Sequence, residues 1–183
     1  AVQYIPTSIA ALLLYTFPVF VAILSYFVEK ERLTKKTVIA MLITLVGLGL
    51  VLGLSFGGIQ PVGVLLALAA ALFYSVYIVV GNRVVKGVSS YVTSAYIALF
   101  ATISTFFITL KDRGGDLTFA VQGWWALFGI VVFSTVVAIS FFFRGLQLIG
   151  STKASVLSTL EPVVTFGFSA LLFGEAFSLL QLL

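Results

Sequence analysis

Cysteine and histidine are both absent from this chain of 183 residues. Their absence excludes disulfides, thiol nucleophiles, imidazole bases and the usual nitrogen and sulfur ligands of zinc. Most hydrolytic and redox mechanisms depend on one of these groups. The sequence therefore predicts a protein that is not an enzyme and that holds no metal and no cofactor.

Charge is also scarce, because only 9% of the residues are charged while 61% are hydrophobic. A soluble domain has about a quarter of its residues charged, so this composition indicates a membrane protein. The apolar residues form blocks of about 18 to 21, the length that crosses about 30 Å of hydrocarbon as a helix. The alternating pattern of a membrane β-barrel strand is missing. We expect an all-α, polytopic helical bundle with six transmembrane helices, at Ser8–Val28, Thr37–Leu54, Val62–Gly81, Tyr91–Leu110, Trp124–Phe143 and Ala154–Phe173.

The basic residues are unevenly distributed over the loops between these blocks. Three alternate loops, "EKERLTKK", "GNRVVKG" and "FRGLQLIGSTK", hold eight of the ten lysines and arginines. The loop "KDRGGDL" holds the other two and balances them with two aspartates. The positive-inside rule places the first three loops in the cytoplasm. The net charge of +4 is then a sign of topology, and no nucleic-acid partner is expected.

The two ends of the chain lack the features of independent termini. The first residues, "AVQYIPTS", have no methionine and no charged region of the kind that begins a signal peptide. The last residues, "GEAFSLLQLL", stop where a new apolar run starts. We expect the chain to be a piece of a larger protein.

An internal repeat appears when the chain is shifted by 144 residues against itself. "QYIPTSIAALLLYTFPVFVAILSYFVEKERL" then lies over "QLIGSTKASVLSTLEPVVTFGFSALLFGEAF", with Pro18 matched to Pro162 and Glu31 matched to Glu175. Five expected crossings separate the two prolines, so the two copies would enter the membrane from opposite sides. Inverted repeats of this kind are common in secondary transporters.

The phrases "AALLLYTFPVFVAILSYF", "LITLVGLGLVLG", "LLALAAALFYSVYIV" and "FRGLQLIGSTKASVLSTLEPVVTFGFSALLFGEAF" resemble the EamA-like branch of the drug/metabolite transporter superfamily. The resemblance covers nearly the whole chain and implies ten helices in two inverted five-helix repeats. Residues 1–55 would end the first repeat and residues 56–183 would form most of the second, so that the chain as a whole would supply helices four to nine. It implies a permease of a prokaryotic cytoplasmic (inner) membrane that moves a small metabolite, such as an amino acid, by alternating access. Proton coupling and a homodimer are open alternatives.

Glu161 is the ionisable residue that the repeat does not explain, because its match in the first copy is Phe17. Each mid-helix proline removes an N–H, so the carbonyls of Leu14 and Ser158 lose their helical partners and the helices kink. Glu161 shares one helix face with hydroxyl residues, of which Ser158 and Thr165 are the nearest. A carboxylate there is expected to bind substrate or a proton. The alternative is that it only ties the kinked helix to its neighbours.

Several other residues have two readings each. Tyr15, Tyr74 and Tyr77 are candidates for lining a substrate pocket, or else pack within the bundle. Arg144 is either an interfacial anchor or a contact for an anionic substrate. The two glutamates of the repeat, at helix ends, are expected to be solvated.

The motif "GLGLVLG" supports a rival function. Gly49 and Gly53 form a GxxxG pair, which permits close packing of helices. A non-transporting membrane subunit that assembles through this face is therefore the alternative to a transporter.

Overall fold

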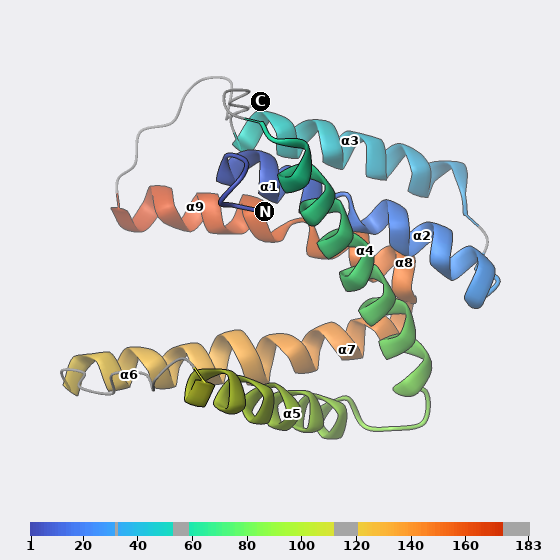
Figure 1. The fold of residues 1–183 in the computed structure, drawn as a ribbon. Helices are drawn as coiled ribbons and strands as arrows, with labels where there is room; N and C mark the ends of the chain where they lie inside the picture. The colour runs from blue at the N-terminus through green and yellow to red at the C-terminus, as the bar shows by residue number, and fades with distance from the viewer. Residues whose placement is uncertain (32, 53–58, 112–120, 174–183) are drawn as a thin grey trace. The chain divides into compact units, whose positions relative to one another are not determined.

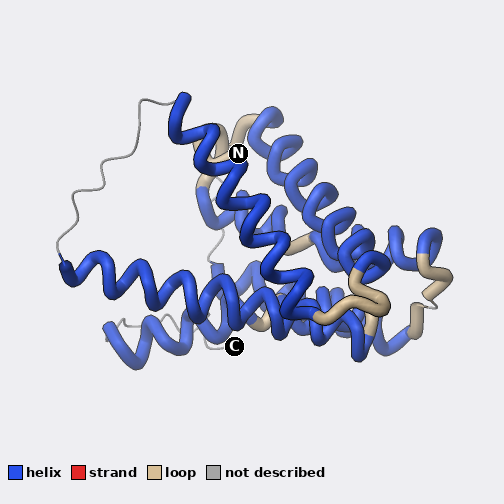
Figure 2. The backbone as a smooth tube through the Cα atoms, turned by 90° about the horizontal axis from the view of Figure 1, so that it is seen from below, coloured by secondary structure: helices blue, strands red, loops and turns tan. Residues whose placement is uncertain are grey.

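The computed structural model describes residues 1–31, 33–52, 59–111 and 121–173 (Figure 1). Within these ranges every regular element is a helix (Figure 2). Four stretches of the described chain are long and apolar enough to cross a membrane, namely Thr7–Val28, Pro61–Val84, Ser90–Leu110 and Gly123–Ile149. The predicted all-α membrane class is confirmed at this level.

The chain divides into two compact units, of which the first contains Ala1–Gly81 and the chain from Gly150 onward. In this unit α2 packs on α8, and α3 packs on both α1 and α8. The helices are α1 (Thr7–Leu14), α2 (Phe17–Val28), α3 (Lys35–Leu52), most of α4 (Pro61–Val84), α8 (Ser151–Ser158) and α9 (Glu161–Phe173).

A stripe of small residues lets α4 approach the start of the chain. Gly63, Ala67, Ala71 and Ser75 follow one another at intervals of four, so they lie on one face of α4, and all four are buried. Ala67 shares a cluster with buried residues of the first helix and the turn before it. Small residues on a membrane helix permit this close backbone approach.

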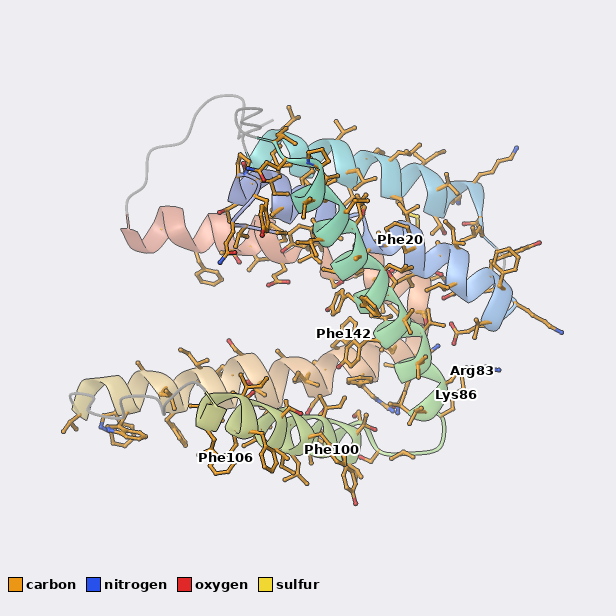
Figure 3. The ribbon with its side chains drawn as sticks, in the orientation of Figure 1. Phe20, Arg83, Lys86, Phe100, Phe106 and Phe142 are labelled. Carbon is orange, nitrogen blue, oxygen red and sulfur yellow. The ribbon has the colours of Figure 1, made fainter. Side chains whose placement is uncertain are left out.

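The second unit contains Asn82–Ile149. In it α5 packs against α7 and against a stretch of π-helix, η1, that directly precedes α7. Phe100 and Phe106 point outward from α5 (Figure 3), as expected for side chains in contact with lipid. The elements are α5 (Ser90–Lys111), α6 (Val121–Gly129), η1 (Ile130–Val137) and α7 (Ala138–Ile149).

The six crossings expected from hydropathy correspond to four candidate spans in the described residues. The block Ala154–Phe173 is divided between α8 and α9, so no continuous helix crosses there. The block Thr37–Leu54 corresponds to α3, whose last described residue is Leu52; its expected end at Leu54 lies outside the described residues. The six-helix count and the inverted repeat stay predictions.

Candidate functional site

The first unit contains two broken helices, α1–α2 and α8–α9, each made of two helices separated by a short interruption. The interruptions fall at matching positions when the chain is shifted by 144 residues. The first helix of each pair ends at Leu14 or Ser158, and the second begins at Phe17 or Glu161, each 144 residues apart. Pro18 and Pro162 are the second residues after the breaks. In Figure 1 the pair α1–α2 and the pair α8–α9 run in opposite directions.

Hydroxyl groups at the breaks bind carbonyls of the chain's own backbone. Thr16 donates its Oγ1 hydrogen to the Leu13 carbonyl at 2.6 Å, and Thr159 donates to the Val156 carbonyl at 2.6 Å. Ser158 donates to the Ser155 carbonyl at 2.8 Å. These bonds help to satisfy backbone groups where the helical pattern is interrupted. The Ser158 hydroxyl hydrogen is thus used inside α8 and does not go to Glu161.

A small cavity of about 10 Å³ lies beside both breaks. This is close to the smallest volume that holds one water molecule. Its lining is almost entirely apolar, although three lining residues carry hydroxyl groups: Tyr15 before α2, Thr44 on α3 and Thr159 after α8. The remaining lining residues are Pro18, Val19, Met41, Leu45 and Val156.

Aromatic rings from α4 and from the first break form a continuous cluster. The rings of Tyr74 and Tyr77 stack with their centroids 5.9 Å apart and their planes at 17°. Phe17 meets Tyr74 edge to face at 4.9 Å, and Tyr15 lies 6.4 Å from Phe17. The hydroxyl of Ser75 donates to the Phe17 carbonyl at 3.0 Å, which fixes α4 against the break.

Glu161 lies beside this aromatic cluster, which we define as Tyr15, Phe17, Tyr74 and Tyr77. Its carboxylate is exposed in the structure and close enough to Tyr15 and Tyr74 to interact electrostatically with both. It is also the first residue of α9, where the helix dipole favours a negative charge. The structure thus brings together Glu161 and the three tyrosines that the sequence singled out, from three separate segments.

The other predicted residues do not belong to the aromatic cluster, and one of them lies outside the described residues. Thr165 is exposed on α9, one turn beyond Glu161. Gly49 is half-buried on α3, while Gly53, its partner in the GxxxG pair, lies outside the described residues. Among the described residues no three His, Cys, Asp or Glu side chains are grouped as a metal site would require.

The solvated state expected for Glu31 is wrong. Its Oε2 accepts a hydrogen bond from Thr152 Oγ1 at 2.7 Å, and Glu29 Oε2 accepts one from Ser151 Oγ at 2.8 Å. Both hydroxyls belong to the first turn of α8, where a helix favours negative charge. The segment after α2 is therefore joined to the start of α8. Glu175 lies outside the described residues.

The chain is similar to several proteins that are named as transporters. It is 27% identical to the uncharacterized transporter YyaM of Bacillus subtilis (strain 168) over 85% of this chain and 53% of that protein. It is 29% identical to an uncharacterized transporter of Archaeoglobus fulgidus over 100% of this chain and 64% of that protein. The chain thus spans between about half and two thirds of the length of these relatives.

A solved structure and a family model complete the comparison. One protein crystal structure matches 99% of this chain and 64% of its own, with a TM-score of 0.82 and 24% sequence identity, which shows the fold alone. The model of the EamA-like transporter family matches residues 1–53 and 61–183. This chain therefore belongs to the EamA-like transporter family.

Proposed function

We propose that this chain forms the substrate-binding part of a secondary transporter, and that its substrate is a small metabolite with an amino group, such as an amino acid. The observation that carries the proposal is the position of Glu161 beside the aromatic cluster. A bacterial or archaeal cytoplasmic membrane agrees with the organisms of the relatives. A charged metabolite crosses the hydrocarbon core of a membrane very slowly by itself, because burying a charge there is unfavourable, so its passage requires a transport protein.

The chemistry of the group suits a cationic amine. A carboxylate supplies the opposite charge, and tyrosine rings attract a cation to their faces through the π-electron quadrupole. Tyrosine hydroxyls add hydrogen-bond partners for a carboxyl or amide on the same ligand. The site is built at two helix breaks, and interrupted helices that face each other are the usual binding elements of carriers with alternating access.

Glu161 is also the natural candidate for proton coupling within this proposal. A carboxylate that faces a binding site in a membrane can exchange a proton for a cationic substrate. Phe17, which occupies the equivalent position of the first broken helix, has no titratable group. Coupling would then reside in the second broken helix only.

The test compares Glu161→Gln with Glu161→Asp, which keeps the charge. The purified protein is first screened for metabolites that raise its melting temperature, because a ligand that binds only the folded state stabilises it. For an amino-bearing ligand we expect Glu161→Gln to weaken binding about tenfold or more, the typical loss of a charged contact. Uptake by proteoliposomes is then measured between about pH 5 and pH 8, where we expect Glu161→Gln to lose the pH dependence that Glu161→Asp retains.

Two results would contradict the proposal. If Glu161→Gln and Glu161→Phe bind and transport like the unaltered protein across this pH range, the carboxylate only ties α9 to its neighbours. If stabilising ligands all lack an amino group, the proposed substrate class is wrong.

The rival function, assembly through the face of Gly49 and Gly53, predicts no stabilisation by any metabolite and a stable oligomer in detergent. A homodimeric transporter would show both the oligomer and the stabilisation.

A further inference from the structure

The second unit contains an open pocket that the proposed transport site does not involve. Its volume is about 770 Å³, and it lies between α7 and the turn that joins α4 to α5. Gly87 in that turn has φ +91°, a conformation that glycine adopts without strain. The lining residues with polar side chains are Lys86, Ser89, Ser90, Tyr91, Ser140, Arg144 and Gln147.

The charges in this pocket are all positive. Lys86 and Arg144 line it, and none of the lining residues is acidic. Figure 3 shows Lys86 just beyond the end of α4, near Arg83, which does not line the pocket. Two cations without a lining carboxylate create a positive potential that an anionic ligand would neutralise.

Gln147 fixes the wall of the pocket and the position of Arg144. Its Nε2 donates to the carbonyls of Val85 at 3.0 Å and Val88 at 2.9 Å, which joins α7 to the turn. Its Oε1 accepts from Arg144 Nη1 at 3.3 Å. The guanidinium carries five N–H donors, so a single bond to Gln147 leaves most of them for a ligand.

The N-terminus of α5 opens on the same pocket. This helix has 22 residues and begins at Ser90, and both Ser89 and Ser90 line the pocket. The first N–H groups of a helix have no partner within the helix, and its dipole places partial positive charge there. Helix N-termini bind phosphate and sulfate for this reason.

Ser140 supplies an independent indication of a ligand. This residue of α7 is one of those that line the pocket, and it is only 5% exposed. Its Oγ has no hydrogen-bond partner among the described residues. A buried hydroxyl without a partner is unfavourable, so such a group is expected to meet a ligand or water.

We propose that this pocket binds a phosphate group. Arg144 and Lys86 supply charge, the start of α5 supplies N–H donors, and the Ser140 hydroxyl donates to a phosphate oxygen. Both basic residues lie in stretches of the sequence that the charge distribution predicts to be at the cytoplasmic side. The phosphate can therefore come from an anionic phospholipid of the inner leaflet or from a soluble phosphate compound, and both sources have the same chemistry at the site.

The experiment measures the melting temperature of the purified 183-residue protein in a neutral detergent. One arm adds inorganic phosphate against chloride at equal ionic strength, and the other adds phosphatidylglycerol against phosphatidylcholine. We expect at least one phosphate-bearing ligand to raise the melting temperature. Its apparent affinity should fall about tenfold or more in Arg144→Gln, because a charged hydrogen bond is lost, and should be unchanged in the control Arg83→Gln.

Two further variants keep the test decisive if Arg144→Gln does not fold. Lys86→Gln changes an exposed side chain, and Ser140→Ala removes the unpartnered hydroxyl, so both should fold and both should weaken the same ligand. A response to inorganic phosphate identifies a soluble source, and a response to phosphatidylglycerol alone identifies a lipid headgroup. The proposal is overturned if neither ligand stabilises the protein, or if Arg83→Gln weakens binding as much as Lys86→Gln does.

Discussion

Alanine at Gly63 and alanine at Gly47 should change stability in opposite directions. A Cβ at Gly63 would lie 2.7 Å from Ile5 Cγ2 and 2.8 Å from Tyr4 Cβ. The Tyr4 Cβ cannot move without its backbone, and the Tyr4 carbonyl accepts a hydrogen bond from the Gln60 N–H at 3.2 Å. At Gly47, in contrast, no atom lies within 4 Å of an added Cβ.

The expected magnitude follows from two terms. Replacing a helical glycine by alanine stabilises the helix by about 0.5–1 kcal/mol, and this term acts at both positions. Overpacking a tight contact costs about 1–3 kcal/mol, and this term acts only at Gly63. Gly47→Ala should therefore raise the free energy of unfolding by about 0.5–1 kcal/mol. Gly63→Ala should have a free energy of unfolding about 1–3 kcal/mol below that of Gly47→Ala.

The assay is equilibrium unfolding of both variants in the same detergent, with the unaltered protein as reference. Comparing two alanines removes the helix-propensity term and leaves the contact at Gly63 alone. If Gly63→Ala proves as stable as Gly47→Ala, α4 does not approach the first turn of the chain as closely as described, and the packing role of the small-residue stripe is refuted.

Two further predictions concern the segment after α2 and the topology. Thr152→Val should lower the free energy of unfolding by about 1.5–3 kcal/mol, because it removes a hydrogen bond to the Glu31 carboxylate. The same substitution should cost less in a protein that already carries Glu31→Gln. Equal losses in both backgrounds would show that the two side chains do not interact. Single cysteines introduced at Lys36 and Lys153 should react only with reagents added from the cytoplasm, and one at Gly115 only from outside. Labelling of all three from one side would contradict the predicted alternation.

The helical class could be predicted because it depends on composition and length alone. Blocks of about 20 apolar residues cannot leave backbone groups unpaired in hydrocarbon, so a helix is required. The same reasoning cannot separate a continuous helix from an interrupted one. The block Ala154–Phe173 has the hydropathy of a single span, yet it is divided at Thr159 and Leu160, because hydropathy is insensitive to the pattern of hydrogen bonds. The π-helical stretch Ile130–Val137 was not predicted for the same reason.

Contacts between distant segments were the least accessible from sequence. Glu31 was expected to be solvated because it follows a helix end, but its partner Thr152 is 121 residues away. The close approach of α4 does have a signal in the sequence, because Gly63, Ala67 and Ala71 repeat at intervals of four, as the GxxxG pair does. The sequence marked Glu161 and the three tyrosines as separate candidates, and the structure supplies their proximity.

The two residues that begin α2 and α9 differ in chemistry although they occupy matching positions of the predicted repeat. Phe17 and Glu161 occupy equivalent positions after equivalent breaks, and both interact with Tyr74. Phe17 does so through ring packing and is 3% exposed, whereas Glu161 is an exposed carboxylate. The shared register determines where the backbone is interrupted. In the proposed transport site, the carboxylate would let the second broken helix bind a cation where the phenyl ring of the first cannot, so Glu161→Phe should remove binding of an amine while leaving the break in place.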